Sequence, residues 1–216
     1  MILPFHDDDE VDAAAAVVGP HLAGGGLLGY PTETVYGLGS FATDDGLDAL
    51  ARLKGRPERK PFLLLIGSRL MAERAGLVFT ASARALADHF WPGPLTLVLK
   101  GGEGRLPERL RGAEGGVAVR HTSHQGMARL IARLDQPITS TSANRSGGPP
   151  APGAAKLAEL FAPAVLGGQL IVLDGGVLGN VPPSTLVDCT TSVPTLIREG
   201  AIPRDELRRA VGRLAP

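Results

Sequence analysis

The sequence has 216 residues, 44% of them hydrophobic, which is enough to form one large domain with a substantial buried core. Its 22 basic residues balance its 22 acidic ones, so the chain as a whole has no electrostatic reason to coat nucleic acid or an anionic membrane. Any anion site must therefore be local. The single cysteine, Cys189, excludes an internal disulfide and a zinc site built from several cysteines.

The first ten residues carry four consecutive acidic side chains, where a signal peptide needs basic residues followed by an apolar core. The apolar runs are short and strand-like, far below the roughly 20 residues of a membrane helix. We therefore expect a soluble cytoplasmic protein with no membrane contact.

Helical and strand patterns alternate along the whole chain, which predicts a layered α/β or α+β domain. The first helix is expected over 11–22, after acidic residues that favour its N-terminus, and it ends at Gly24 to Gly26. A strand follows at 27–30 and a helix at 44–54, capped by Thr43 or Asp44. Further strands are expected at 62–66, 95–100, 116–120, 137–141, 170–173, 184–188 and 195–198, and further helices at 68–75, 82–90, 124–134, 154–161 and 204–211.

Two irregular stretches, 142–152 and 175–183, have neither pattern, and each follows an apolar strand. Loops at strand ends are where α/β proteins carry function, so both stretches are candidate site segments. Within the first, a run of hydroxyl and amide side chains from Ser140 to Ser146 suits a small polar ligand. The alternative is a turn that satisfies its own backbone.

Five basic residues lie within nine positions at the end of the second expected helix: Arg52, Lys54, Arg56, Arg59 and Lys60. Basic side chains also complement a helix C-terminus, which is the alternative explanation. Prolines at 57 and 61 stiffen this segment, and guanidinium pairs suit polyphosphate oxygens. The segment is therefore a candidate phosphate site.

Other common site types are not favoured. Two glycine patterns, at 24–29 and 37–42, match a dinucleotide fingerprint formally but lack its strand–turn–helix context, and there is no P-loop sequence. His121 and His124 have no carboxylate or cysteine nearby to complete a metal site. Cys189 lacks a recognisable activating context, and no nucleophile elbow appears.

Several motifs occur in an order that resembles the YrdC/Sua5 family of threonylcarbamoyl-AMP synthases, over about residues 20–200. The resemblance rests on PTETVYGLG at 31–39, KGRP at 54–57, KP at 60–61, WPGPLT at 91–96, VR at 119–120, STSANRSG at 140–147, ST at 184–185 and REG at 198–200. It implies one YrdC-like domain over 1–216, with a peripheral helix at 203–212 and without the C-terminal domain of longer Sua5 proteins. Its fold would be a twisted open mixed sheet flanked by helices, with a concave basic face as the active site.

The resemblance also implies roles for particular residues. Lys54 and Arg56 would be catalytic. ATP would be bound by Arg56, Lys60, Arg120, Ser140, Asn144 and Arg198. Threonine would be held by Thr32, Tyr36, His124, Ser142 and Ser184, with Tyr36 and His124 lining the pocket.

The activity implied is a nucleotidyl transfer that condenses L-threonine, bicarbonate or CO2 and ATP into threonylcarbamoyl-AMP and pyrophosphate, for tRNA modification. Mg²⁺ would enter with ATP, no protein metal site is expected, and a separate tRNA threonylcarbamoyl transferase complex would take the product. Because the threonine amine is the first nucleophile, the protein need only position and neutralise its substrates.

Leu65 departs from the pattern, since many synthases carry a histidine there, and the run at 62–66 resembles instead the YciO-like branch of the family. The alternatives are therefore a YciO-like paralogue acting as an RNA- or ribosome-associated binding protein, with weak double-stranded RNA binding, or carbamoyl chemistry on another acceptor, as in hydrogenase-maturation domains. Neutral charge and few aromatic residues count against RNA binding.

Overall fold

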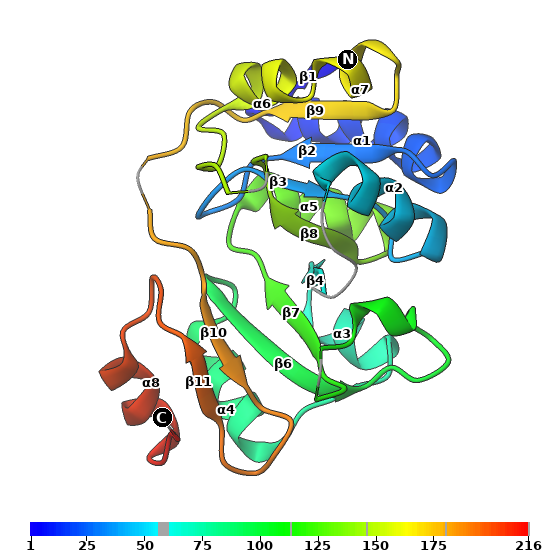
Figure 1. The fold of residues 1–216 in the computed structure, drawn as a ribbon. Helices are drawn as coiled ribbons and strands as arrows, with labels where there is room; N and C mark the ends of the chain where they lie inside the picture. Colours follow the sequence, from blue (N-terminus) through cyan, green and yellow to red (C-terminus); the bar gives the residue numbers. More distant parts are fainter. Residues whose placement is uncertain (56–60, 113, 146, 180, 216) are drawn as a thin grey trace.

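A large mixed sheet forms the centre of the molecule in this computed structural model, which describes residues 1–55, 61–112, 114–145, 147–179 and 181–215. Within these residues, eleven strands join in the order β1-β9-β2-β3-β8-β4-β7-β6-β10-β11, and β5 pairs with β6 at the side of this path (Figure 1). The strands are β1 (Ile2–Pro4), β2 (Leu27–Tyr30), β3 (Gly37–Gly39), β4 (Leu63–Ile66), β5 (Leu77–Val78), β6 (Leu95–Gly101), β7 (Val117–His121), β8 (Ile138–Ser142), β9 (Leu170–Asp174), β10 (Thr185–Asp188) and β11 (Thr195–Arg198).

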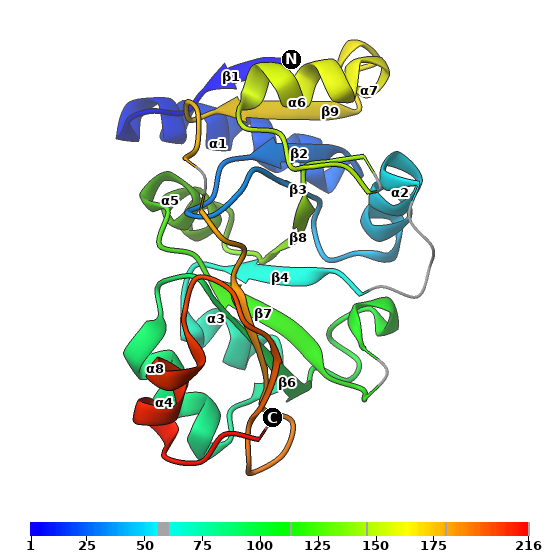
Figure 2. The same cartoon turned by 60° about the vertical axis from the view of Figure 1, so that its left-hand side comes forward.

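The helices flank this sheet, in agreement with the predicted α/β class. They are α1 (Asp8–Ala23), α2 (Asp44–Lys54), α3 (Arg69–Arg74), α4 (Ala81–Phe90), α5 (Gln125–Leu134), α6 (Ala154–Leu160), α7 (Ala162–Leu166) and α8 (Arg204–Val211), with a 3-10 turn at Glu108–Leu110. Helices α1 and α5 pack on each other, α6 packs on β9 and β2, and α8 packs on α4 (Figures 1 and 2). None of the described helices combines the length and the apolar run that crossing a bilayer requires.

The predicted helices and strands are confirmed, mostly to within one or two residues. The first helix starts three residues earlier than predicted, because Asp7 is its cap and accepts a hydrogen bond from the backbone N–H of Glu10 at 2.9 Å. Thr43, and not Asp44, caps α2. Three strands of two or three residues (β1, β3 and β5) and the five-residue helix α7 were not predicted, because two or three residues are too few to show an alternating strand pattern and five residues are too few to show a helical one.

Strand β8 joins the two halves of the sheet by pairing antiparallel with both β3 and β4. Its end, Thr141 and Ser142, pairs with β3, whereas its beginning, residues 138–140, pairs with β4. The backbones of β3 and β8 lie very close together at this junction, because a Cβ added to Gly39 would lie 1.8 Å from the carbonyl oxygen of Thr139. A glycine at position 39 is therefore a condition of the strand pairing.

Replacing Gly39 with alanine is expected to lower the free energy of unfolding by about 3 kcal/mol, because the added methyl must push β3 away from β8. Urea unfolding checks this. Gly179→Ala is the matched control, since a Cβ there meets nothing within 4 Å, and its effect should stay within about 0.5 kcal/mol. Equal stability of the two variants would contradict the steric argument.

Asp12 on α1 accepts hydrogen bonds from the guanidinium groups of Arg129 and Arg133 on α5, at 2.7 and 2.8 Å for the shortest contacts. These two arginines hold the pKa of the Asp12 carboxyl well below its ordinary value of 3.8. The ionised carboxylate therefore stabilises the folded chain at neutral pH, and this contribution is lost as the pH falls below about 4.

The Asp12→Asn variant should accordingly be less stable than the unaltered chain at pH 7, by an amount that shrinks as the pH is lowered from 4 towards 2. Chemical unfolding of both proteins across this pH range measures the difference. A difference independent of pH would show that the charge of Asp12 does not contribute.

Candidate active site

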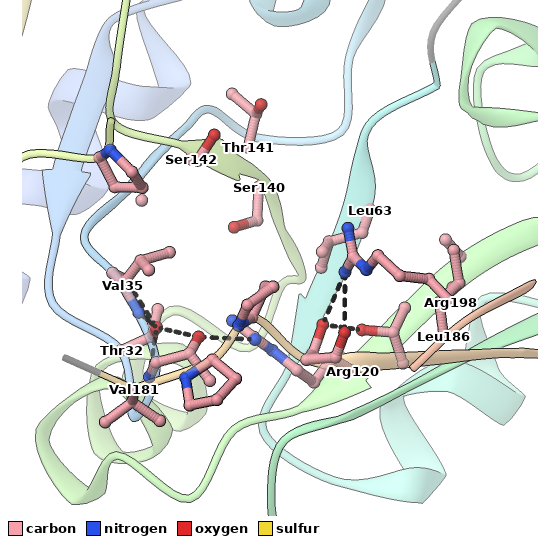
Figure 3. Close-up of a pocket in the computed structure, with 18 of the residues that line it drawn as sticks. Thr32, Val35, Leu63, Arg120, Ser140, Thr141, Ser142, Val181, Leu186 and Arg198 are labelled. Atoms are coloured by element: carbon pink, nitrogen blue, oxygen red, sulfur yellow. Dashed lines mark hydrogen bonds between the residues drawn. The ribbon is translucent and has the colours of Figure 1, made fainter. Parts of the chain in front are cut away.

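A cavity of about 1040 Å³ opens on the concave face, between the β2–β3–β8 half of the sheet and the β4–β7–β6–β10–β11 half (Figure 3). Both halves of the sheet contribute hydroxyl-bearing and apolar side chains to its wall, and Arg120 and Arg198 lie on strands of the second half. The polar residues of the wall include Thr32, Thr34, Thr96, Arg120, Ser140, Thr141, Ser142, Ser184 and Arg198, and the apolar ones include Val35, Leu63, Val98, Leu178, Val181, Leu186 and Ile197.

The side chain of Thr32 stabilises a turn in the loop between β2 and β3. The Thr32 hydroxyl donates to the carbonyl of Val35 at 2.6 Å and accepts from the backbone N–H groups of Thr34 and Val35, both at 3.2 Å. A hydroxyl that satisfies nearby backbone groups fixes a loop without a helix or strand. This turn presents Thr32, Thr34 and Val35 to the cavity.

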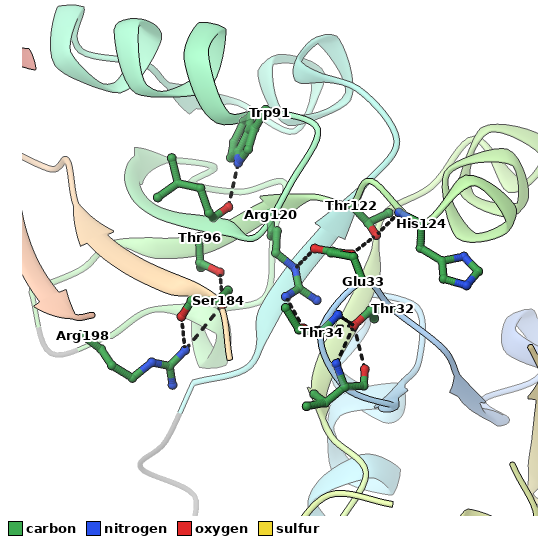
Figure 4. A network of polar contacts seen from close by, with 12 residues as sticks. Thr32, Glu33, Thr34, Trp91, Thr96, Arg120, Thr122, His124, Ser184 and Arg198 are labelled. Atoms are coloured by element: carbon green, nitrogen blue, oxygen red, sulfur yellow. Dashed lines mark hydrogen bonds and ion pairs between the residues drawn. The ribbon is translucent and has the colours of Figure 1, made fainter. Parts of the chain in front are cut away.

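Arg120, from β7, is the most buried charged group of the site, with a side chain only 5% exposed. Its Nη1 donates to the Thr34 hydroxyl at 3.2 Å, and its Nε lies 3.5 Å from Oε1 of Glu33 (Figure 4). The other carboxylate oxygen of Glu33 accepts from the Thr122 hydroxyl at 2.6 Å. Arg120 is thus held by two residues of the β2–β3 loop, one of them an acid.

Arg198, at the end of β11, lines the same cavity from the edge strand of the same half of the sheet. Its Nη2 donates to the carbonyl of Ser184 at 2.8 Å, and the Ser184 hydroxyl is 2.9 Å from that of Thr96 (Figure 4). Partial burial lowers the pKa of Arg198, and the neighbouring Arg120 cation lowers it further. The Arg198 guanidinium nevertheless stays protonated at neutral pH. Two cations therefore face one hollow.

Lys54, the last residue of α2, lies behind the wall formed by β8. Its ammonium group donates to the carbonyl of Ser142 at 2.8 Å, to Oδ1 of Asn144 at 2.8 Å, and to the Asn144 carbonyl. The Ser142 hydroxyl also donates to Oδ1 of Asn144, at 2.6 Å. Lys54 thereby fixes the chain where it leaves β8 for the irregular stretch.

Both irregular stretches predicted from the sequence border the cavity. Residues 149–152 and 178–183 contribute to its wall, with residue 180 outside the described part of the chain. The two segments are joined where the N–H of Leu178 donates to the carbonyl of Pro152 at 2.9 Å. Together they cover the side of the cavity between β9 and β10.

Six of the residues implied by the resemblance line the cavity: Thr32, Arg120, Ser140, Ser142, Ser184 and Arg198. Lys54 and Asn144 lie one layer behind, as described above. Arg56 and Lys60 lie outside the described residues.

Tyr36 and His124 are not among the described residues that line this cavity, and their predicted contact with threonine stays a prediction. The Tyr36 hydroxyl is turned away to donate to the carbonyl of Gly176 at 2.7 Å, and burial raises its pKa. The His124 ring stacks on Phe5 and accepts from the N–H of Met127 at the start of α5, and burial lowers its pKa. Both side chains support neighbouring segments instead.

Sequence reasoning missed Glu33, Thr34 and Thr96 as members of the site. Each carried a signal: Glu33 is an acid between two threonines directly after an apolar strand, and Thr96 interrupts the apolar run of β6. What the sequence does not contain is the pairing of Glu33 with a residue 87 positions further along the chain.

Leu65, the position where the resemblance leads us to expect a histidine, is fully buried on β4 and is paired with Arg120 in the strand register. Leu63, two residues earlier on the same face, is the β4 residue that reaches the cavity. Position 65 is thus occupied by a buried apolar residue next to Arg120 in the sheet.

No group of three metal-ligating side chains occurs within the described residues. Glu114 and Asp188 are carboxylates of the cavity wall. Mg²⁺ needs only one or two carboxylates when phosphate oxygens and water supply its other ligands, so these residues fit a metal ion carried in by a phosphate substrate.

Comparison with known proteins identifies the family. Residues 21–200 match the Sua5–YciO–YrdC family model, whose description is "Telomere recombination". The chain belongs to the Sua5–YciO–YrdC family. It is 37% identical over 191 residues to the threonylcarbamoyl-AMP synthase of Pyrococcus abyssi, covering 88% of this chain and 55% of that protein. It is 38% identical over 182 residues to the threonylcarbamoyl-AMP synthase of Chromohalobacter salexigens, covering 84% and 92%.

Among solved structures, P. abyssi Sua5 complexed with L-threonine superposes with a TM-score of 0.86 at 33% identity, over all of this chain and 63% of that one. Escherichia coli YciO superposes with a TM-score of 0.75 at 24% identity, which shows a shared fold, over 93% and 95% of the two chains. The chain thus spans little more than half the length of the P. abyssi relative.

The role of Lys54 can be tested by removing its charge. Lys54→Met should lower the free energy of unfolding by about 2 kcal/mol, because three oxygens of the 142–144 segment lose a charged donor. The control is Lys156→Met, which breaks an exposed ion pair with Glu159 and should change stability by less than about 1 kcal/mol. Thermal and urea unfolding report both values, and equal effects would contradict the structural role of Lys54.

Proposed function

We propose that this chain is a threonylcarbamoyl-AMP synthase, a nucleotidyltransferase that uses L-threonine, bicarbonate or CO2, and ATP. The observation that carries the proposal is the convergence of two guanidinium groups and several hydroxyls, from segments far apart in the sequence, on one cavity (Figure 3). The relatives that carry this name and the Sua5 structure with bound threonine support the same assignment.

The size of the cavity supports a reaction of several substrates. Pockets for a single drug-sized ligand span roughly 300–1,000 Å³, and this cavity reaches about 1040 Å³. Guanidinium groups bind phosphate oxygens, and hydroxyl groups suit a small hydroxy amino acid. The cavity therefore offers complementary chemistry for ATP and for threonine at the same time.

The chemistry asks the protein for position and charge rather than for a nucleophile of its own. The threonine amine attacks CO2 with loss of a proton, or bicarbonate with loss of water, to give a carbamate. A carbamate oxygen then attacks the α-phosphorus of ATP and expels pyrophosphate. Cys189 is unsuited to covalent catalysis, because it is fully buried and burial raises its pKa to about 12. Arg198 would instead neutralise the charge that develops on the phosphates.

Mg²⁺ would enter bound to ATP, with phosphate oxygens as its main ligands and Glu114 or Asp188 of the cavity wall as candidate carboxylate ligands. The cytoplasmic location, the hand-over to a separate tRNA-modifying transferase complex and any weak RNA binding remain predictions from the sequence.

A direct assay tests the proposal: pure protein is incubated with ATP, Mg²⁺, bicarbonate and one amino acid at a time, and pyrophosphate release is measured. Release only with threonine is expected. Release with no amino acid contradicts the proposal, and so does salt-sensitive RNA binding without ATP consumption, which the YciO-like alternative predicts.

Arg198→Ala should lower the rate of pyrophosphate release about a hundredfold or more, because a cation that contacts the phosphates is lost. Arg209→Ala, on the exposed surface of α8, is the matched control and should leave the rate unchanged. Full activity of Arg198→Ala would show that Arg198 does not bind the phosphates.

A further inference from the structure

The two guanidinium groups of the cavity differ in how their charge is compensated. Arg120 has a carboxylate beside it, since Glu33 Oε1 lies 3.5 Å from its Nε. Arg198 contacts only neutral oxygens of Ser184, and within the described residues no acid lies in ion-pair distance of it. The wall of the cavity is therefore not uniformly positive.

Glu33 is the acid that lies beside Arg120. Its side chain is 13% exposed, compared with 5% for Arg120, so water screens this pair only weakly. Oε2 is fixed by the Thr122 hydroxyl at 2.6 Å, and Thr122 in turn accepts from the N–H of His124 at the start of α5. The carboxylate thus reaches from the β2–β3 loop across the sheet to the end of β7 (Figure 4).

Glu33 and Arg120 interact mainly through their opposite charges. Glu33 Oε1 and Arg120 Nε are both buried atoms without a well-formed hydrogen bond, although they face each other. A buried cation without its counter-ion is costly, so the carboxylate compensates a charge that the fold itself places there.

We propose that Glu33 is a positioning residue that orients and neutralises Arg120, so that the polyphosphate binds at Arg198 and Arg120 does not act as a second strong anion site. The identity of the anion rests on the proposed function. A compensated Arg120 still offers directed donors beside Thr34, where a polar substrate group can bind without attracting a second polyanion.

Removing the compensating charge of Glu33 is expected to increase the affinity for an anion. In Glu33→Gln the amide oxygen still accepts from Thr122, but the charge on Arg120 is no longer balanced. Inorganic pyrophosphate should then bind at least about threefold more tightly, because one negative charge near the bound anion has gone. The gain should shrink at high ionic strength.

Isothermal titration of inorganic pyrophosphate into the purified full chain measures this, with circular dichroism as the check on folding. Thr122→Val is the matched control, since it removes the Thr122 hydrogen bond and leaves all charges in place, and its pyrophosphate affinity should not rise. Damage to the site by itself weakens binding and does not tighten it.

The double variant Glu33→Gln with Arg120→Met removes both charges and should bind pyrophosphate within about twofold of the unaltered chain. This variant keeps the test decisive if Glu33→Gln alone does not fold. A tenfold loss in the double variant, or an unchanged or weaker affinity in folded Glu33→Gln, overturns the inference. Absence of pyrophosphate binding to the unaltered chain contradicts the proposed function itself.

Discussion

The pairing of β8 with two neighbours is the constraint on which the molecule depends. Strand β3 pairs with the end of β8, and β4 pairs with its beginning. The two halves of the sheet are therefore offset along β8 where they meet. Gly39 allows the backbones of β3 and β8 to approach closely enough for this. The hollow between the halves is a consequence of that junction, and β8 itself supplies Ser140, Thr141 and Ser142 to its wall.

Charge is distributed unevenly in a chain that is neutral overall. The surface pairs, such as those of Asp12 with Arg129 and Arg133, join helices to each other, whereas Arg120 and Arg198 face the cavity. Glu33 limits the positive charge there to what the site needs.

The support of the site is as specific as its lining. Three residues that do not line the cavity hold segments close to it. Lys54 fixes the chain where it leaves β8, Tyr36 fixes the segment after β9, and His124 fixes the start of α5. A reaction that aligns several substrates without an enzyme nucleophile depends on such fixed segments, because misplacement by an ångström costs orders of magnitude in rate. Their roles are thus consistent with the chemistry proposed for the cavity.

The sequence by itself determined the order and class of the elements, the family, and the segments that carry the site, because periodicity, caps and local motifs are properties of neighbouring residues. A cap at Thr43 or Asp44 and the loops at 142–152 and 175–183 could be predicted in this way, and the structure shows that Thr43 is the cap. The tertiary structure alone decided which of those residues face the cavity: it turned Tyr36 and His124 away, placed Lys54 behind β8, and set Glu33 against Arg120. These outcomes depend on contacts between residues some 90 to 140 positions apart, which strand order and side-chain direction fix only after the sheet has formed.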